Sequence, residues 1–266
     1  MYTIIQCACP GMANRIKSYV SLMGKYDIVK TCNFSDSYIF NGIDYISDGD
    51  VEIYPVIRAE DFIEQKMWQI KVFPEEYDYI DDYITIDYLY EKTPQYFIDK
   101  YLPFFDKLDI NKEIINYVDN FTKNWVDVVG VHIRSWYCSK HQLHDNSIFE
   151  EEIGKIDKNI KIFFCSDNSD VQKYFIEKYG DRIITYDREL YNTAHKSESG
   201  FNHDVQSNID AFIEMLILSK CTTIIGTFSS TFDEVSWWLS NCKSKVIIPT
   251  PLKVPSNMYG EMFIKK

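Results

Sequence analysis

The chain has 266 residues, and its 40 Asp and Glu against 28 Lys and Arg give a formal net charge of −12 at pH 7. This acidic balance excludes a protein that binds nucleic acid mainly through phosphate charge, because such binding needs a surplus of basic residues. Hydrophobic residues make up 45% of the chain, which excludes intrinsic disorder. The length exceeds that of a typical single domain, so one large domain or two compact halves are expected.

The sequence carries no sign of a membrane span or a secretory signal. No stretch approaches the roughly 20 uninterrupted apolar residues that a span needs. The start, Met1–Gln6, has neither a basic region nor a long apolar run, which indicates a cytoplasmic protein. The cysteines form no C-x-x-C pair, so reduced core thiols are expected rather than a zinc site or a disulfide framework.

The first 30 residues predict a β-loop-α-β unit. A strand over Tyr2–Gln6 leads through a small-residue loop, Cys7–Ala13, into a helix over Asn14–Met23, and a second strand covers Tyr26–Thr31. Residues 32–120 are rich in Tyr, Asp and Ile and predict few elements. Helical spacing reappears there in two segments, Thr93–Tyr101 and Asn111–Phe121.

From Trp125 onward, apolar strands alternate with amphipathic helices. The predicted strands are Val126–Ile133, Asn159–Cys165, Arg182–Tyr186, the end of Lys220–Gly226, and Lys245–Pro249. The predicted helices are Ser147–Ile156, Ser169–Tyr179, Asp204–Ser219 and Ser229–Ser240. Near-continuous apolar strands joined by helices require a parallel sheet that is covered on both faces. This half is therefore predicted to be a doubly wound α/β domain.

Ligands of such sheets bind outside the carboxyl ends of the strands, and three of these ends carry polar side chains. Arg134 follows the first strand directly, where its planar guanidinium can bind a phosphate through two hydrogen bonds; a salt bridge at the rim is the alternative. Ser166, Asp167 and Asn168 follow the second strand, and capping of the next helix explains only part of this turn.

The third strand end, Gly226–Thr231, is a cluster of hydroxyl residues that opens a helix. The free backbone N–H groups and the positive end of the helix dipole suit a phosphate at this position. A helix N-cap without a ligand is the alternative interpretation.

The order and spacing of these strand ends resemble the α1,6- and protein O-fucosyltransferase superfamily of GT-B glycosyltransferases, which includes the nodulation fucosyltransferases. Residues 129–134 (VGVHIR), 163–168 (FFCSDN) and 210–231 (DAFIEMLILSKCTTIIGTFSST) are similar to its first, second and third motifs. The resemblance covers most of residues 126–248. A shorter likeness links Gly11–Arg15 with the glycine-rich loop and first helix of related fucosyltransferases.

The resemblance implies a GT-B fold of two Rossmann-like domains. Residues 1–122 would form the acceptor-side domain and residues 123–250 the GDP-sugar-binding domain, with residues 251–266 packing back on the N-terminal domain. The implied activity is an inverting, metal-independent transfer of a sugar, L-fucose first, from a GDP-sugar to a glycan or another hydroxyl acceptor. No cofactor is implied beyond this donor substrate.

The resemblance also implies how the diphosphate is held. Arg134 would contact the β-phosphate and stabilise the charge that grows on the leaving group. Ser229 and Ser230, in one turn with Thr227 and Phe228, would bind the same diphosphate from the start of the helix.

Other residues would contact the nucleoside and the sugars. Glu214, where the family usually has an aspartate, would accept hydrogen bonds from the guanine edge, and His132 would lie under the nucleoside. Asp167 would approach the donor or acceptor sugar. Gly11 and Asn14, in the N-terminal motif, would also belong to the donor site.

An inverting transfer needs a general base near the acceptor hydroxyl. His141, His144 and Asp145 follow the first motif, and in the α1,6 enzymes the base comes from this loop. The alternatives are exposed loop residues without a role, with the base supplied by the N-terminal domain or by the leaving phosphate itself.

The chain departs from the mammalian α1,6-type pattern in three places. Ser135 and Tyr137 stand where that pattern has a second arginine and an aspartate, and Asn168 replaces one of two paired aspartates. These differences leave the acceptor and the donor sugar open, because they remove charges from the side of the site that faces the sugars.

Two other functions compete with this hypothesis. A non-catalytic protein that binds a sugar nucleotide or a glycan could use the same scaffold, since fold does not determine function. Asp48 and Asp50 have the D-x-D form with which metal-dependent GT-A transferases hold a divalent ion, although Asp-Gly is also a common hairpin turn. A tight turn is the favoured interpretation there.

Overall fold

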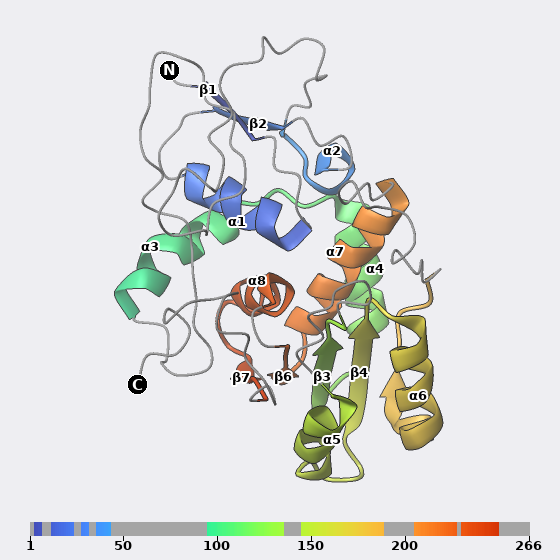
Figure 1. Ribbon diagram of the computed structural model, residues 1–266. Helices are drawn as coiled ribbons and strands as arrows, with labels where there is room; N and C mark the ends of the chain where they lie inside the picture. Colours follow the sequence, from blue (N-terminus) through green and yellow to red (C-terminus); the bar gives the residue numbers. More distant parts are fainter. Residues whose placement is uncertain are drawn as a thin grey trace. The chain divides into compact units, whose positions relative to one another are not determined.

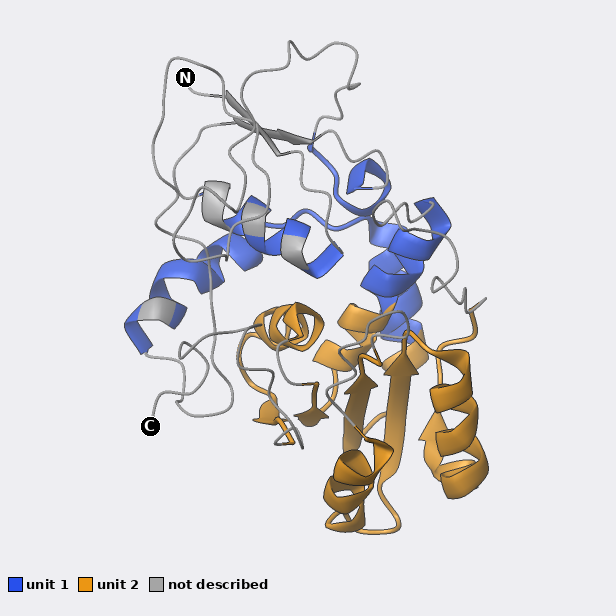
Figure 2. Cartoon of the chain, viewed as in Figure 1, with its two compact units in different colours: residues 1–85, 95–120, 198–213 blue, residues 86–94, 121–197, 214–266 orange. Residues whose placement is uncertain are grey.

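The computed structural model describes residues 3–6, 12–23, 28–31, 36–43, 95–135, 145–188, 205–227 and 230–249. The chain forms two compact units (Figure 2). Unit 1 contains residues 1–85, 95–120 and 198–213, and unit 2 contains residues 86–94, 121–197 and 214–266. The predicted division between residues 122 and 123 stays a prediction.

Unit 1 begins with a small parallel sheet. Strands β1 (Thr3–Gln6) and β2 (Ile28–Thr31) pair in parallel, and helix α1 (Met12–Met23) connects them (Figure 1). The predicted β-loop-α-β unit is thus confirmed. Its loop, which includes Gly11, lies outside the described residues.

Short helices complete the described part of unit 1. The one-turn helix α2 (Asp36–Ile39) was not predicted, whereas α3 (Gln95–Phe105) and α4 (Lys112–Thr122) confirm the predicted helical segments. The ring of Phe40, directly after α2, lies 6.1 Å from that of Tyr19 in α1 and 5.1 Å from that of Phe212.

Unit 2 contains a five-stranded sheet in the order β5-β4-β3-β6-β7, with every neighbouring pair parallel (Figure 1). Its strands are β3 (Val128–Ile133), β4 (Lys161–Ser166), β5 (Ile183–Ile184), β6 (Thr223–Ile225) and β7 (Lys245–Ile247). The helices between these strands in the chain are α5 (Asn146–Gly154), α6 (Ser169–Tyr179), α7 (Val205–Ser219), of which residues 205–213 belong to unit 1, and α8 (Thr231–Leu239). All five predicted strands and the parallel sheet are confirmed.

Alternate residues of the central strand face opposite sides of the sheet. Val131 and its neighbours two positions away pack in one core cluster with Phe149 of α5 and Phe175 of α6. Gly130 faces the other side, where an added Cβ would overlap the side chain of Leu218 in α7. Glycine thus lets α7 approach the sheet, and helices cover both faces as a doubly wound domain requires.

The strand order locates the place where a ligand is expected. The chain runs from β3 outward through β4 to β5, and then returns to the other side of β3 to form β6 and β7. The direction of winding therefore reverses between β3 and β6. In open α/β sheets, the crevice at the carboxyl ends of two such strands binds ligands.

Two cysteines of unit 2 are core residues. Cys165 in β4 and Cys221 before β6 are fully buried, and burial raises the pKa of each thiol above its usual value. These thiols stay protonated, as expected for cysteines that pack in a core.

No helix in the described ranges is long and apolar enough to cross a membrane.

Candidate functional site

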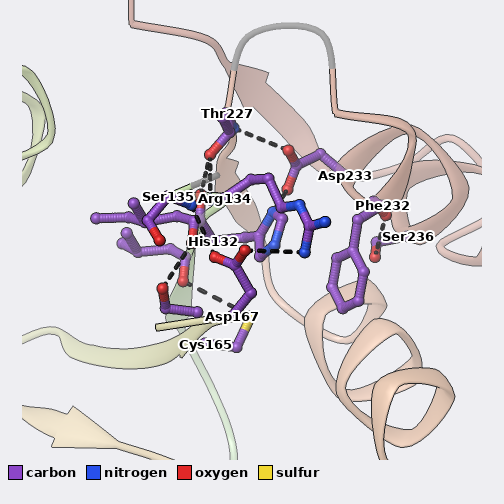
Figure 3. Close-up of polar contacts among 12 residues, drawn as sticks. His132, Arg134, Ser135, Cys165, Asp167, Thr227, Phe232, Asp233 and Ser236 are labelled. Carbon is purple, nitrogen blue, oxygen red and sulfur yellow. Dashed lines mark hydrogen bonds and ion pairs between the residues drawn. The ribbon is translucent and has the colours of Figure 1, made fainter. Parts of the chain in front are cut away.

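Thr227 joins the ends of the two strands at the reversal point. The ladder between β3 and β6 ends with the pair Val131 and Ile225. Beyond it, the Thr227 hydroxyl donates to the carbonyl of His132 at 2.8 Å and accepts from the backbone N–H of Arg134 at 2.9 Å (Figure 3). One buried side chain therefore fixes the backbone from which Arg134 projects.

Asp233 ties the start of α8 to the same place. Its carboxylate accepts from the backbone N–H of Thr227 at 2.8 Å and lies 2.8 Å from Nδ1 of His132. Gly226 makes this approach possible, because a Cβ there would lie 2.7 Å from the carboxyl carbon of Asp233. The sequence analysis did not identify Asp233, since an acidic residue in the first turn of a helix is common in any protein.

The His132 side chain is enclosed by protein. Its ring stacks on Phe232 with the centroids 4.3 Å apart, and its Nδ1 atom faces Asp233 (Figure 3). His132 is only 4% exposed. The predicted contact of this residue with a nucleoside stays a prediction.

Arg134 and Asp167 form an ion pair at the carboxyl edge of the sheet. Nη1 of Arg134 lies 2.9 Å from Oδ2 of Asp167, and the other carboxylate oxygen accepts from the backbone N–H of Ser135 at 2.7 Å. The side chains are 30% and 18% exposed, so a ligand can reach both. The carboxylate orients the guanidinium and neutralises part of its charge.

Ser166, Asp167 and Asn168, at the end of β4 and directly after it, each bond to a different part of the protein. Asn168 caps α6, since its side-chain oxygen accepts from the backbone N–H groups of Asp170 and Val171. The Ser166 hydroxyl donates to the carbonyl of Ile133 at 2.7 Å and ties β4 to β3. Asp167 is left to hold Arg134, so capping explains one of the three residues.

Glu214 of α7 forms a largely buried ion pair with Arg188. Nη2 of Arg188 lies 2.9 Å from Oε2 of Glu214 and donates to the carbonyl of Ser166 at 3.2 Å. Burial first, and then the charges of Glu214 and Asp233, raise the pKa of Cys165 in β4. The guanine contact of Glu214 stays a prediction.

Sequence analysis missed Arg188, although a signal was present. Arg188 follows the third predicted strand, Arg182–Tyr186, by two residues, much as Arg134 follows the first. The same rule, a basic side chain after a buried strand, would have selected it.

The turn that leads into α8 is described only in part. Ser230 occupies the N-cap position, and its backbone N–H donates to the carbonyl of Thr227 at 3.1 Å. Asp233 and Glu234 lie buried in the first turn of α8, where they use part of the positive end of the helix dipole. Phe228 and Ser229 lie outside the described residues, so their predicted contacts with a diphosphate stay predictions.

Asp145, one of three candidates for the general base, is the N-cap of α5. Its side chain accepts from the backbone N–H of Ser147 at 2.8 Å, and this bond lowers the pKa of the carboxyl below its usual value. A lower pKa makes a weaker base. The other candidates, His141 and His144, lie outside the described residues.

The N-terminal motif contributes a buried ion pair in unit 1. Nε and Nη2 of Arg15 donate to the carboxylate of Asp36 at 3.1 and 2.9 Å, and Nη2 also donates to Asn208 at 3.1 Å. The Tyr19 hydroxyl donates to the same carboxylate. Asn14, the predicted donor contact, lies in α1, and its side chain is outside the described part.

No group of three His, Cys, Asp or Glu side chains that could hold a metal ion occurs within the described ranges. Asp48 and Asp50, the candidates for a D-x-D metal site, lie outside those ranges.

Comparison with known proteins relates the fold to one group of enzymes. No protein-family model matches the chain, and no curated protein matches its sequence. Among solved structures, NodZ alpha-1,6-fucosyltransferase co-crystallized with GDP is similar, with a TM-score of 0.50, 14% identity, and coverage of 88% of this chain and 91% of that chain. The fucosyltransferase NodZ from Bradyrhizobium gives the same values.

A plant enzyme has a similar fold. A mutant of FUT1 from Arabidopsis thaliana in complex with GDP has a TM-score of 0.53 and 14% identity, and the match covers 96% of this chain and 71% of that chain. The chain therefore has the mixed α/β fold of GT-B fucosyltransferases, as its motifs implied.

Proposed function

We propose that the chain is an inverting, metal-independent glycosyltransferase that moves a sugar from a GDP-sugar to a hydroxyl of a glycan or glycoconjugate. GDP-fucose is the first donor to test. One observation carries the proposal: Arg134 and Thr227 meet at the reversal point of a sheet whose fold is that of fucosyltransferases crystallised with GDP. In this proposal residues 123–250 bind the donor, and residues 1–122 provide the acceptor side.

The first requirement of the reaction is a stable leaving group. When the bond between the anomeric carbon and the β-phosphate oxygen breaks, negative charge grows on GDP. Arg134, held by Asp167 and partly exposed, supplies a fixed positive charge for this diphosphate. Ser229 and Ser230 add donors from the turn before α8. Because an arginine and a helix start provide the positive charge, no metal ion is required.

The second requirement is removal of the proton from the acceptor hydroxyl. In a single displacement, the acceptor attacks the anomeric carbon opposite the diphosphate and inverts its configuration. His141 and His144 are better candidates for the base than Asp145, because the Asp145 carboxylate accepts the capping hydrogen bond of α5. The leaving phosphate itself is the alternative base.

The identity of the nucleotide depends on Glu214. Guanine offers two adjacent N–H donors that one carboxylate can accept together, and neither uracil nor adenine has such a pair. The ion pair with Arg188 fixes the carboxylate of Glu214 in one orientation. This arrangement favours GDP over UDP and ADP.

Calorimetric titration with GDP, UDP and ADP, each with and without EDTA, tests the proposal. We expect binding of GDP that is stronger than that of the other two and indifferent to EDTA, followed by hydrolysis or transfer when GDP-fucose is supplied. UDP binding that needs a divalent ion would instead favour a metal-dependent enzyme that uses Asp48 and Asp50. GDP binding without turnover of any GDP-sugar would favour a non-catalytic binding protein.

A further inference from the structure

Ser135, the residue after Arg134, has a buried hydroxyl with an unusual environment. The residue is only 5% exposed, and its Oγ atom has no hydrogen-bond partner among the residues that the structure describes, although its backbone N–H donates to Asp167. Ser135 thus places an unpaired polar group beside the residues that the proposed function assigns to the diphosphate.

An unpaired buried hydroxyl destabilises a protein, because the group has lost its hydrogen bonds to water and gained none in return. Nearly all buried polar groups in folded proteins have a partner. Alanine would fill almost the same volume at this position without that cost. A hydroxyl that has no partner within the described ranges is available to a ligand that joins the protein from outside.

The neighbours of Ser135 indicate what kind of partner this is. Arg134 provides a positive charge, and its Nη1 atom and the N–H of Ser135 both donate to the carboxylate of Asp167. These two donors thus converge on the Asp167 carboxylate near the end of β3, which lies at the reversal point of the sheet. A hydroxyl in this group suits the oxygen of a further anion, and a phosphate oxygen is a strong acceptor.

We propose that the hydroxyl of Ser135 donates a hydrogen bond to the β-phosphate of the GDP donor and so determines how tightly the diphosphate is held. This inference rests on the proposed function, since it concerns the same donor. It assigns a binding contact to a residue for which the sequence analysis noted only the absence of a charge.

The test compares Ser135→Ala and Ser135→Thr with the wild-type protein in calorimetric titrations with GDP and with GMP, which lacks the β-phosphate. We expect Ser135→Ala to weaken GDP binding about tenfold, as loss of a hydrogen bond to a charged group does, and to leave GMP binding unchanged. Ser135→Thr keeps the hydroxyl and is expected to retain most of the GDP affinity. Urea unfolding without nucleotide is expected to show Ser135→Ala at least as stable as the wild type.

Three results would overturn the inference: unchanged GDP affinity in Ser135→Ala, an equal loss for GDP and GMP, or a clear loss of stability without nucleotide. The last would mean that the hydroxyl has a partner within the protein. Failure of the wild-type protein to bind GDP would overturn the proposed function as well. Wild-type binding with an unaffected Ser135→Ala variant would overturn this inference alone.

Discussion

Each unit of the molecule contains an arginine paired with an aspartate, and the two pairs differ in exposure. In unit 1, the side chains of Arg15 and Asp36 are 5% and 0% exposed. In unit 2, those of Arg134 and Asp167 are 30% and 18% exposed. The same two residue types are thus paired inside a core in unit 1 and at the carboxyl edge of a sheet in unit 2.

The surroundings of the two pairs explain what each can do. Around Arg15 and Asp36, Tyr19 and Asn208 add further hydrogen bonds, so the charges are compensated within the protein. Arg134 is oriented by Asp167 at a place where a ligand can reach it. A closed, buried network stabilises a fold, whereas a partly exposed pair at the reversal point of a sheet can bind an anion.

The largest expected effect is on the stability of unit 1. Asp36→Ala would remove the carboxylate that accepts hydrogen bonds from the buried Arg15 guanidinium, and we expect the free energy of unfolding to fall by about 3–5 kcal/mol. In the matched variant Asp167→Ala, a smaller loss of about 1–2 kcal/mol is expected, because water can solvate the partly exposed arginine but the N–H of Ser135 loses its acceptor. Urea unfolding at pH 7 measures both values.

A second variant separates charge compensation from packing. Replacement of both buried side chains by apolar ones, Arg15→Met with Asp36→Leu, should recover part of the stability that Asp36→Ala loses, because both charges of this ion pair are removed together. Equal losses in Asp36→Ala and Asp167→Ala would show that exposure does not separate the two pairs.

The next effect concerns the exposed pair and is functional. Arg134→Ala should lower the rate of transfer from a GDP-sugar by about 10²–10³-fold, because the positive charge that stabilises the leaving diphosphate is removed. The free energy of unfolding should change by about 1 kcal/mol or less, as for other exposed pairs. Turnover of GDP-sugars and calorimetric GDP titration measure the functional loss.

Arg182 provides a matched control for Arg134 in the same unit. It precedes β5 and donates to the carbonyls of Ile160 and Asp157, so it lies at the amino end of the strand rather than at the carboxyl end. Arg182→Ala should leave GDP affinity unchanged. Near-normal turnover in Arg134→Ala would mean that the first motif does not bind the diphosphate.

A smaller effect is expected at Gly226, beside the hydrogen bond between Asp233 and Thr227. Thr227 in turn holds the backbone of Arg134. A Cβ at Gly226 would lie 2.7 Å from the carboxyl carbon of Asp233, so Gly226→Ala must displace Asp233 from Thr227 and His132. We expect the free energy of unfolding to fall by about 1–3 kcal/mol, as in other overpacked sites. GDP binding should weaken with it.

Gly154 in α5 is the control for the glycine substitution. Nothing lies within 4 Å of a Cβ added there, and alanine favours a helix, so Gly154→Ala should stabilise the protein by about 0.5–1 kcal/mol. If both alanine variants shift stability in the same direction, the close approach of Asp233 to Gly226 does not limit the site.

The sequence predicted those features that depend on local patterns. The strands of unit 2 are apolar runs, and Arg134, Asp167 and Thr227 follow such runs, so both the sheet and the side chains at its edge could be found. Helix α2 has four residues and is too short to show a helical period.

The contacts that complete the site join residues far apart in the chain. His132 and Asp233 are separated by 101 positions, and nothing in the local sequence of either one specifies the other. The unpaired hydroxyl of Ser135 depends likewise on what surrounds it in the folded chain. Such features follow from tertiary packing, which a single sequence does not determine.

The smallest expected effect decides between two roles of Asp145. If this residue acts only as the N-cap of α5, Asp145→Asn should keep both stability and transfer activity, because asparagine caps helices equally well. Asp145→Ala should lose stability at pH 7 because the Ser147 N–H loses its acceptor. Urea unfolding and GDP-sugar turnover of the two variants measure these outcomes.

The pH dependence of stability gives an independent check on Asp145. The capping bond lowers the pKa of this carboxyl in the folded protein below its ordinary value of 3.8, so its contribution is fully present above that value and is lost as the pH falls through the lower folded pKa. Asp145→Asn has no carboxyl at this position to protonate. The wild type should therefore lose stability relative to Asp145→Asn as the pH falls below 3.8. A variant with unchanged stability but no turnover would instead identify Asp145 as the base that takes the acceptor proton.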